Sequence, residues 1–153
     1  MNFIQLFEDN IDFFQKEIDD FFEINKDDYE FFHPHSLTWG DLKNIIFTKS
    51  KDSYVLMVED GEVAGYGLLR GWDEGYDIPS LGIMISRNYR GKGYSSILMN
   101  ELHSIAKKVG SKKIRLTVFK ENKKAISLYN KLGYEFSDKN EKELIGIKSL
   151  ENV

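Results

Sequence analysis

Two cations and two glycines within four residues form the part of the sequence best suited to bind an anion. Arg90, Gly91, Lys92 and Gly93 follow a short apolar run from Leu81, and a long helical pattern comes directly after them. The first turn of a helix carries unpaired N–H groups and the positive end of the helix dipole, and glycine lets a ligand approach the backbone closely. These residues alone predict a phosphate- or pyrophosphate-binding turn.

Two other phosphate-binding motifs do not fit this turn. A P-loop needs glycine five residues before the Gly-Lys pair, where Ser86 stands, and Ser or Thr after the lysine, where Gly93 stands. A dinucleotide-binding G-x-G-x-x-G would need a third glycine at the position of Ser96. Both motifs are therefore excluded.

The turn resembles the R/Q-x-x-G-x-G/A signature of the GNAT acyltransferase superfamily. The matching residues are Arg90, Gly91, Lys92, Gly93, Tyr94 and Ser95. Ser95 departs from the usual Gly or Ala, but it is small, so we expect an adjusted fit with binding retained. A second stretch, residues 113–136, resembles the fifth strand, fourth helix and sixth strand of the family. Its N-x-x-A-x-x-L-Y-x-x-x-G-Y pattern is carried by Asn122, Ala125, Leu128, Tyr129, Gly133 and Tyr134.

This resemblance implies a single-domain α+β fold over residues 1–153. Its sheet would be central, mixed, mostly antiparallel and twisted, with about four flanking helices. The resemblance covers residues 53–147, which would form the cofactor-binding core. The first fifty residues match no specific pattern, as expected for the variable acceptor-side helices of the family.

The same resemblance implies acetyl-CoA as co-substrate, with no metal. The backbone of Ile83, Met84 and Ile85 would pair with the pantetheine amides like an added strand, and the N–H of Ile85 would polarise the thioester carbonyl. Residues 90–95 would hold the pyrophosphate through their amides. Asn122, with Ala125 and Tyr129 on the same helix, would reach the cofactor, although Asn122 also suits a plain helix N-cap.

Tyr129 is the expected catalytic acid in this reading. Attack by an amine on the thioester expels a thiolate, and a phenol with a pKa of ~10 beside the sulfur would protonate it. The alternative role is a tyrosine of the core. The general base is open, because the strand from Ser80 to Ser86 contains no acid. The candidates are His33, His35, Glu59, Asp73, Glu74 and Asp77, and a chain of waters is the remaining alternative.

The elements that position these residues follow from periodicity and from turn residues. Helices are expected over 10–22, with Asn10 as cap, over 38–47 behind a capping box of Thr38 and Asp41, over 92–109 and over 122–132. Strands are expected over 3–6, 53–59, 62–70, 81–85, 113–118, 134–136 and 143–147. Asp60 and Gly61 between two apolar runs indicate a hairpin. The resemblance to the GNAT family implies that two aromatic segments, 31–35 and 71–76, border the acceptor pocket, and ordinary loop packing is the alternative.

Composition narrows the class of protein. The absence of cysteine excludes disulfides, thiolate metal sites and a cysteine nucleophile. The net charge is −4, and residues 1–31 are strongly acidic. This stretch is either a solvated acidic helix face or a wall that attracts a cationic amine, and either way it disfavours nucleic acid as the main partner. The start of the chain has no signal-peptide pattern, and no apolar run is long enough to span a bilayer, so we expect a cytoplasmic protein with no membrane partner.

Three functions remain open from the sequence. The first is an N-acetyltransferase acting on a small amine, namely an amino sugar, a nucleotide-linked amino sugar, a polyamine or an amino acid. The second is N-acetylation of a protein or peptide, which would require an open groove. The third is an acetyl-CoA-binding module without turnover, against which the presence of Tyr129 argues. The oligomeric state, a homodimer included, is not determined by these residues.

Overall fold

Seven strands form one sheet in the computed structural model, which describes residues 1–28, 35–49 and 51–151. The strands are β1 (Asn2–Gln5), β2 (Ser53–Glu59), β3 (Glu62–Arg70), β4 (Ser80–Ile85), β5 (Lys113–Phe119), β6 (Glu135–Asp138) and β7 (Glu143–Ser149). Their order in the sheet is β1-β2-β3-β4-β5-β7-β6, and neighbours are antiparallel except β4 and β5. The predicted α+β fold with a mixed, mostly antiparallel sheet is confirmed.

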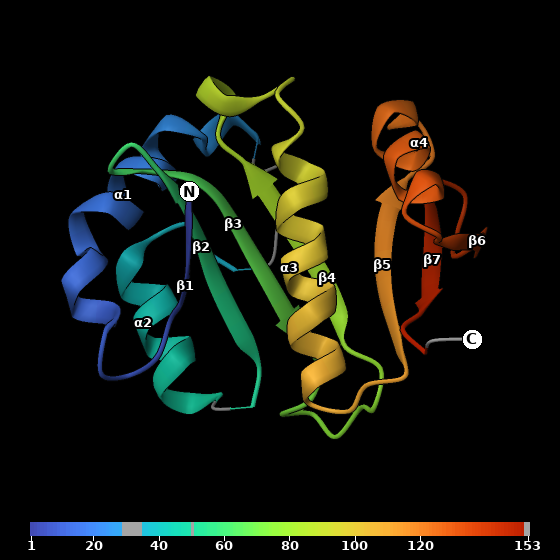
Figure 1. Ribbon diagram of the computed structural model, residues 1–153, viewed down its shortest axis with the longest axis horizontal. Helices are drawn as coiled ribbons and strands as arrows, with labels where there is room; N and C mark the ends of the chain where they lie inside the picture. The colour runs from blue at the N-terminus through green and yellow to red at the C-terminus, as the bar shows by residue number, and fades with distance from the viewer. Residues whose placement is uncertain (29–34, 50, 152–153) are drawn as a thin grey trace.

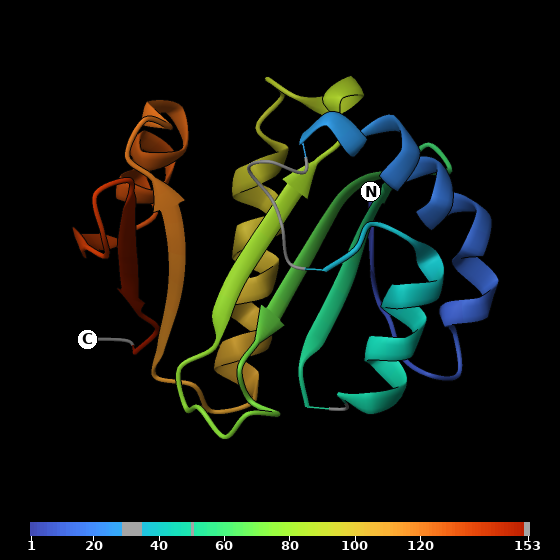
Figure 2. The ribbon, with the colours of Figure 1, turned by 180° about the vertical axis from the view of Figure 1, so that it is seen from behind.

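Four α-helices flank this sheet (Figure 1). They are α1 (Gln15–Ile24), α2 (Trp39–Thr48), α3 (Tyr94–Lys108) and α4 (Lys123–Lys131), with short 3₁₀ turns at Ile11–Phe14, Lys26–Asp28 and Arg87–Tyr89. Helices α3 and α4 pack on one face, where Leu98 and Leu102 of α3 meet the strands, and α1 and α2 pack on the other, where Ile18 and Leu42 are buried. Viewed from behind, α1 and α2 stand over β1 to β3, and the same face of β5 and β7 carries no helix of the described residues (Figure 2).

Several turns form where their residues predicted them. Asp60 and Gly61 both have positive φ, 52° and 78°, and join β2 to β3. Gly110, with φ of 93°, and Gly133, with φ of 98°, follow the last turns of α3 and α4. Thr38 accepts a hydrogen bond from the Asp41 N–H at 3.1 Å and caps α2, as the sequence predicted.

One predicted cap is wrong. The side chain of Asn10 does not cap the first helix: its carboxamide accepts from the Phe7 N–H at 2.7 Å and donates to the Gln5 carbonyl at 2.8 Å. These bonds shape the turn that leaves β1, and the helix that follows starts as a 3₁₀ turn before α1. Asparagine forms such local turns as readily as it caps a helix, and the sequence pattern does not distinguish the two.

The sheet splits between β4 and β5. This parallel pair has one register position, Ser80 opposite Arg115. In contrast, β5 pairs with β7 along its whole length, from Lys113 to Phe119. Beyond Ser80, β4 therefore leaves its edge towards β5 without strand partners.

A buried hydrogen bond ties α3 to the segment before β6. His103 Nε2 lies 2.7 Å from the Tyr134 hydroxyl, and both side chains are buried. Burial lowers the pKa of His103 to about 4, so the ring is neutral at neutral pH. In the described part of the chain, no helix has the length and hydropathy that crossing a membrane requires.

Candidate active site

The open edge of β4 offers backbone groups at alternate residues. The Pro79 carbonyl accepts from the Arg115 N–H at 3.0 Å, so odd-numbered residues of β4 direct their peptide groups towards β5. Beyond the split, these are Ile83 and Ile85. Met84 instead lies opposite Tyr66 of β3, its peptide groups face that strand, and its side chain is buried. The expectation that Met84 would pair with a ligand is therefore corrected, because strand alternation turns it the wrong way.

The turn after β4 presents a bare backbone. Gly91 and Gly93 have φ of 75° and 81°, and a Cβ placed on either would meet no atom within 4 Å. Gly93 is also the N-cap of α3, so among the described residues no capping side chain bonds to the amides of the first helical turn, which include those of Tyr94 and Ser95. Open amides at a helix start fit the diphosphate of a coenzyme.

Side chains of this turn contact neighbouring elements and hold the turn in place. Arg90 Nε donates to the Ile85 carbonyl at 3.1 Å, which links the turn to the end of β4. The Lys92 ammonium lies 5.6 Å from the ring centroid of Tyr89. The Tyr94 hydroxyl donates to Glu59 at 3.3 Å. The main chain of the turn, with the charges of Arg90 and Lys92 near it, is thus the part arranged for an anion.

A residue that the sequence did not indicate also holds the turn. Asn25, fully buried at the end of α1, accepts from the Arg87 N–H at 2.9 Å and donates to the Ser86 hydroxyl at 3.3 Å. It also donates to the Phe21 carbonyl at 2.8 Å. Asn25 stands 61 residues from Ser86, so no local pattern predicts the contact.

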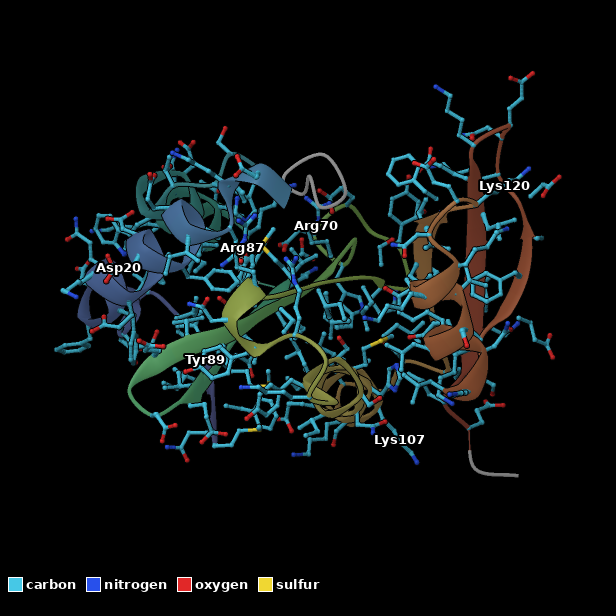
Figure 3. The ribbon with its side chains drawn as sticks, turned by 90° about the horizontal axis from the view of Figure 1, so that it is seen from above. Asp20, Arg70, Arg87, Tyr89, Lys107 and Lys120 are labelled. Atoms are coloured by element: carbon cyan, nitrogen blue, oxygen red, sulfur yellow. The ribbon has the colours of Figure 1, made fainter. Side chains whose placement is uncertain are left out.

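A cavity of about 1140 Å³ opens at the split between β4 and β5. Its wall includes Gly82 of β4, Thr117 of β5, Asn122 and Tyr129. It extends over the helix-free face of β5 and β7 and reaches the loop between β3 and β4. Arg70, at the end of β3, also lines it, and Figure 3 shows Arg70 on the α1–α2 side of the sheet, opposite Lys107 of α3. The cavity thus lies beside the first residues of β4 at the split and continues over the helix-free face of β5 and β7.

Tyr129 of α4 lines this cavity. Its ring also packs against the core and lies 5.9 Å from that of Tyr134. Burial raises the pKa of Tyr129 to about 12, so the hydroxyl keeps its proton at neutral pH. Within residues 1–28, 35–49 and 51–151, no hydrogen bond to this hydroxyl is present. A protonated hydroxyl in a cleft is suited to donate to a ligand.

Asn122 serves as the N-cap of α4. Its carboxamide oxygen accepts from the Ala125 N–H at 3.2 Å, which is the plain capping role that the sequence left open. Because Asn122 also lines the cavity, the cap sits at the wall of the cleft. The side chain of Ala125 packs against the core. Both residues thus fix the first turn of the helix that carries Tyr129.

His35 is held against the sheet on the acceptor side. Its Nδ1 lies 2.6 Å from the Ser36 carbonyl and its Nε2 lies 2.8 Å from the Tyr66 hydroxyl. A carbonyl only accepts, so Nδ1 carries the proton, and Nε2 of the neutral ring accepts from Tyr66. Burial lowers the pKa of His35 below its ordinary value. His33, the other candidate histidine, lies outside the described residues.

The acidic candidates for the base are mostly occupied elsewhere. Glu59 binds Tyr94 and the N-terminal ammonium, Asp73 accepts from the N–H groups of Lys51 and Asp52, and Glu74 pairs with Lys49. Asp77 lines the cavity.

The sequence of this chain matches a known protein family. Residues 18–134 match a family model described as the acetyltransferase (GNAT) family. This chain belongs to the GNAT family. The matched residues include the open edge of β4, the glycine turn and Tyr129, so the candidate site lies within the part of the chain that matches the GNAT family.

Solved structures share the GNAT fold with this chain at low sequence identity. Ribosomal-protein-S5-alanine acetyltransferase from Vibrio fischeri has a TM-score of 0.77 at 14% identity, with 98% of this chain and 93% of that chain covered. A variant of spermidine N-acetyltransferase SpeG from Vibrio cholerae has a TM-score of 0.75 at 15% identity, covering 98% and 95%. PaiA N-acetyltransferase from Thermoplasma acidophilum, in complex with coenzyme A, has a TM-score of 0.70 at 17% identity, covering 97% and 99%.

Proposed function

We propose that this GNAT protein transfers the acetyl group of acetyl-CoA to a primary amine of a small molecule, by direct attack in a ternary complex. One observation carries the proposal: β4 separates from β5 beyond Ser80, the cavity at this split has Tyr129 in its wall, and the same strand leads into a glycine turn with bare amides. The coenzyme A complex of the T. acidophilum relative supports acetyl-CoA as the donor.

The proposed roles follow the open edge of β4. Acetyl-CoA supplies a thioester whose carbonyl carbon accepts the amine. The Ile83 N–H polarises that carbonyl, because Ile83 adjoins Gly82, which lines the cavity with Tyr129. We assign this role to Ile83 in place of Ile85, whose N–H would bind a pantetheine amide further along the edge.

Tyr129 is the proposed general acid. As the new C–N bond forms and the C–S bond breaks, the electron pair of that bond goes to sulfur, and the Tyr129 hydroxyl donates its proton there. Burial disfavours any anion, so it raises the proton affinity of the departing sulfur as well as that of the phenol.

His35 is the proposed base, acting through Tyr66 and a chain of waters. The Tyr66 hydroxyl donates to His35 Nε2, but Tyr66 is fully buried and is not part of the cavity wall. Water would therefore take the proton from the amine and pass one to Tyr66, which would give its own proton to His35.

His35→Gln is expected to change the pH profile of kcat/KM. A base must be unprotonated to work, so activity should rise with pH through the pKa of His35, which burial places below 6.5. The ascending limb below that pH should disappear in His35→Gln and persist in the control His103→Gln, whose ring lies on the other face of the sheet. Steady-state rates from pH 5 to 8 provide the measurement. A limb unchanged by His35→Gln would exclude this base.

A screen of amines with detection of free thiol tests the function itself. We expect acetyl-CoA to bind in calorimetry, and at least one small amine to release coenzyme A above the rate of hydrolysis. Peptide N-termini and lysine peptides belong in the same screen, because turnover of peptides alone would favour protein acetylation. Binding of acetyl-CoA with no turnover of any amine or peptide would indicate a binding module.

A further inference from the structure

Two arginines flank a serine on three neighbouring strands of the acceptor cavity. Ser80 of β4 lies opposite Arg70 of β3 on one side and opposite Arg115 of β5 on the other. Residues in register direct their side chains to the same face, and adjacent strands are about 4.8 Å apart, so the two arginine Cα atoms lie within about 10 Å of each other. All three residues line the cavity that also contains Tyr129.

The positive charge of Arg115 is not neutralised by its surroundings. Among the residues that the structure describes, none forms an ion pair with the Arg115 guanidinium. The other charged groups on the cavity wall are Lys49, Glu74, Asp77, Lys139 and Glu143. Of these, Lys49 and Glu74 pair with each other, and Glu143 accepts from Asn140 at 3.0 Å. With Arg70 and Arg115 included, the wall carries four cationic and three anionic side chains, and both charged residues in register with Ser80 are cationic, which favours an anionic group there.

We call Arg70, Ser80 and Arg115 the row, and reciprocal hydrogen bonds fix the backbone next to it. Asp52 accepts from the N–H groups of Gly71 and Trp72, at 3.2 and 3.1 Å, directly after Arg70. Asp73 in turn accepts from the Asp52 N–H at 2.9 Å. These bonds hold the end of β3 and the start of the next loop in place, so Arg70 projects from a rigid position. Preorganised donors lose less entropy when they bind a ligand.

The row also has a defined distance from the reaction centre. Three residues of β4 separate Ser80 from Ile83, the amide that we assign to the thioester carbonyl, and a strand rises about 3.3 Å per residue. An anion at the row would thus lie about 10 Å from the reacting atoms. An acceptor whose nitrogen reacts beside Ile83 can therefore place an anionic group at Ser80 only if a spacer separates the nitrogen from that group.

We propose that the acceptor is a primary amine with a carboxylate or phosphate about 10 Å from its reactive nitrogen, bound by Arg70, Ser80 and Arg115. This inference rests on the proposed acetyl transfer. Arg115 pairs with the oxyanion by charge-assisted hydrogen bonds, and the Ser80 hydroxyl donates a third. A polyamine would bring positive charge against the arginines, so the row selects against that class of acceptor.

Matched amines test the selection without requiring turnover. In calorimetry with coenzyme A present, 8-aminooctanoate is compared with octylamine and 1,8-diaminooctane, and 6-aminohexyl phosphate with 6-aminohexanol, since about eight bonds separate each anionic group from the amine. We expect the anionic member of each set to bind on the order of ten-fold to a hundred-fold more tightly. The set with the larger preference identifies carboxylate or phosphate as the group recognised. Equal binding within both sets, or tightest binding of the diamine, would overturn the inference.

Arg115→Gln should reduce this preference to less than about three-fold. Lys113→Gln is the matched control, because it removes one positive charge from the same strand at a residue outside the cavity wall. Arg115→Lys keeps the charge without the planar fork and should give an intermediate preference. An Arg115→Gln protein that keeps the full preference, or a Lys113→Gln protein that loses as much, would assign the effect to overall charge and refute the site.

Turnover separates this inference from the proposed function. If the anionic amines bind preferentially to the wild type and no amine is acetylated, the anion site stands and acetyl transfer fails. If amines are acetylated and the neutral or dicationic members are the better substrates in kcat/KM, acetyl transfer stands and the anion site fails.

Discussion

Tyr129→Phe is expected to lower kcat by ~10²–10⁴-fold with little change in the dissociation constant of acetyl-CoA, because general acid catalysis contributes about that factor. The substitution keeps the ring that packs against the core and removes only the hydroxyl in the cleft. Steady-state kinetics and calorimetric binding on the same protein measure both quantities.

Tyr134→Phe is the matched control for this experiment. Its hydroxyl is buried against His103 and its ring lies 5.9 Å from that of Tyr129. Removing it leaves the His103 ring without that partner, so the free energy of unfolding should fall by about 1–3 kcal/mol while kcat stays near the wild-type value. Should Tyr129→Phe retain more than about a third of kcat in single turnover, where product release does not limit the rate, the acid role is excluded.

Gly93→Asp is expected to weaken acetyl-CoA binding by about a hundred-fold or more, because an anion placed against a diphosphate costs several kcal/mol. The new carboxylate would enter the open space before the first turn of α3, where an added Cβ meets no atom within 4 Å. Calorimetric titration with coenzyme A provides the measurement.

Gly61→Asp separates this charge effect from backbone strain. Gly61 has φ of 78° against 81° for Gly93 and has the same open surroundings, but it lies in the hairpin between β2 and β3. Both variants should lose similar stability, since a left-handed conformation costs an L-residue roughly 1–2 kcal/mol. Only Gly93→Asp should lose affinity, and equal losses of affinity in both would show that the turn does not bind the coenzyme.

Features encoded by neighbouring residues were predictable from the sequence. The glycine turn before α3, the Asp60-Gly61 hairpin and the Asn122 cap of α4 each depend on conformations that a few adjacent residues determine. The places of the strands along the chain followed for the same reason, because alternation and turn residues are local signals, although β6 and β7 extend beyond the predicted ranges 134–136 and 143–147.

Features that depend on strand register were not predictable. The outward direction of Ile83 and Ile85, and the inward direction of Met84, follow from pairing with β3, which periodicity alone does not reveal. The alignment of Arg70 with Arg115 joins residues 45 positions apart in the chain through Ser80. The hydrogen bond of His35 to Tyr66 likewise forms only after the α1–α2 segment packs on the sheet.

Asn25 limits how this protein can be re-engineered. The acceptor-side helices and the coenzyme turn suggest two exchangeable modules, with a boundary near residue 50. Yet the Asn25 carboxamide belongs to the first module and supports Ser86 and Arg87 at the entrance to the second. A chimera that replaces residues 1–28 with those of another acetyltransferase would transplant an acceptor surface and, unless it preserves this asparagine, withdraw a support of the coenzyme turn. A chimera should therefore keep the end of α1 together with the coenzyme turn that it supports.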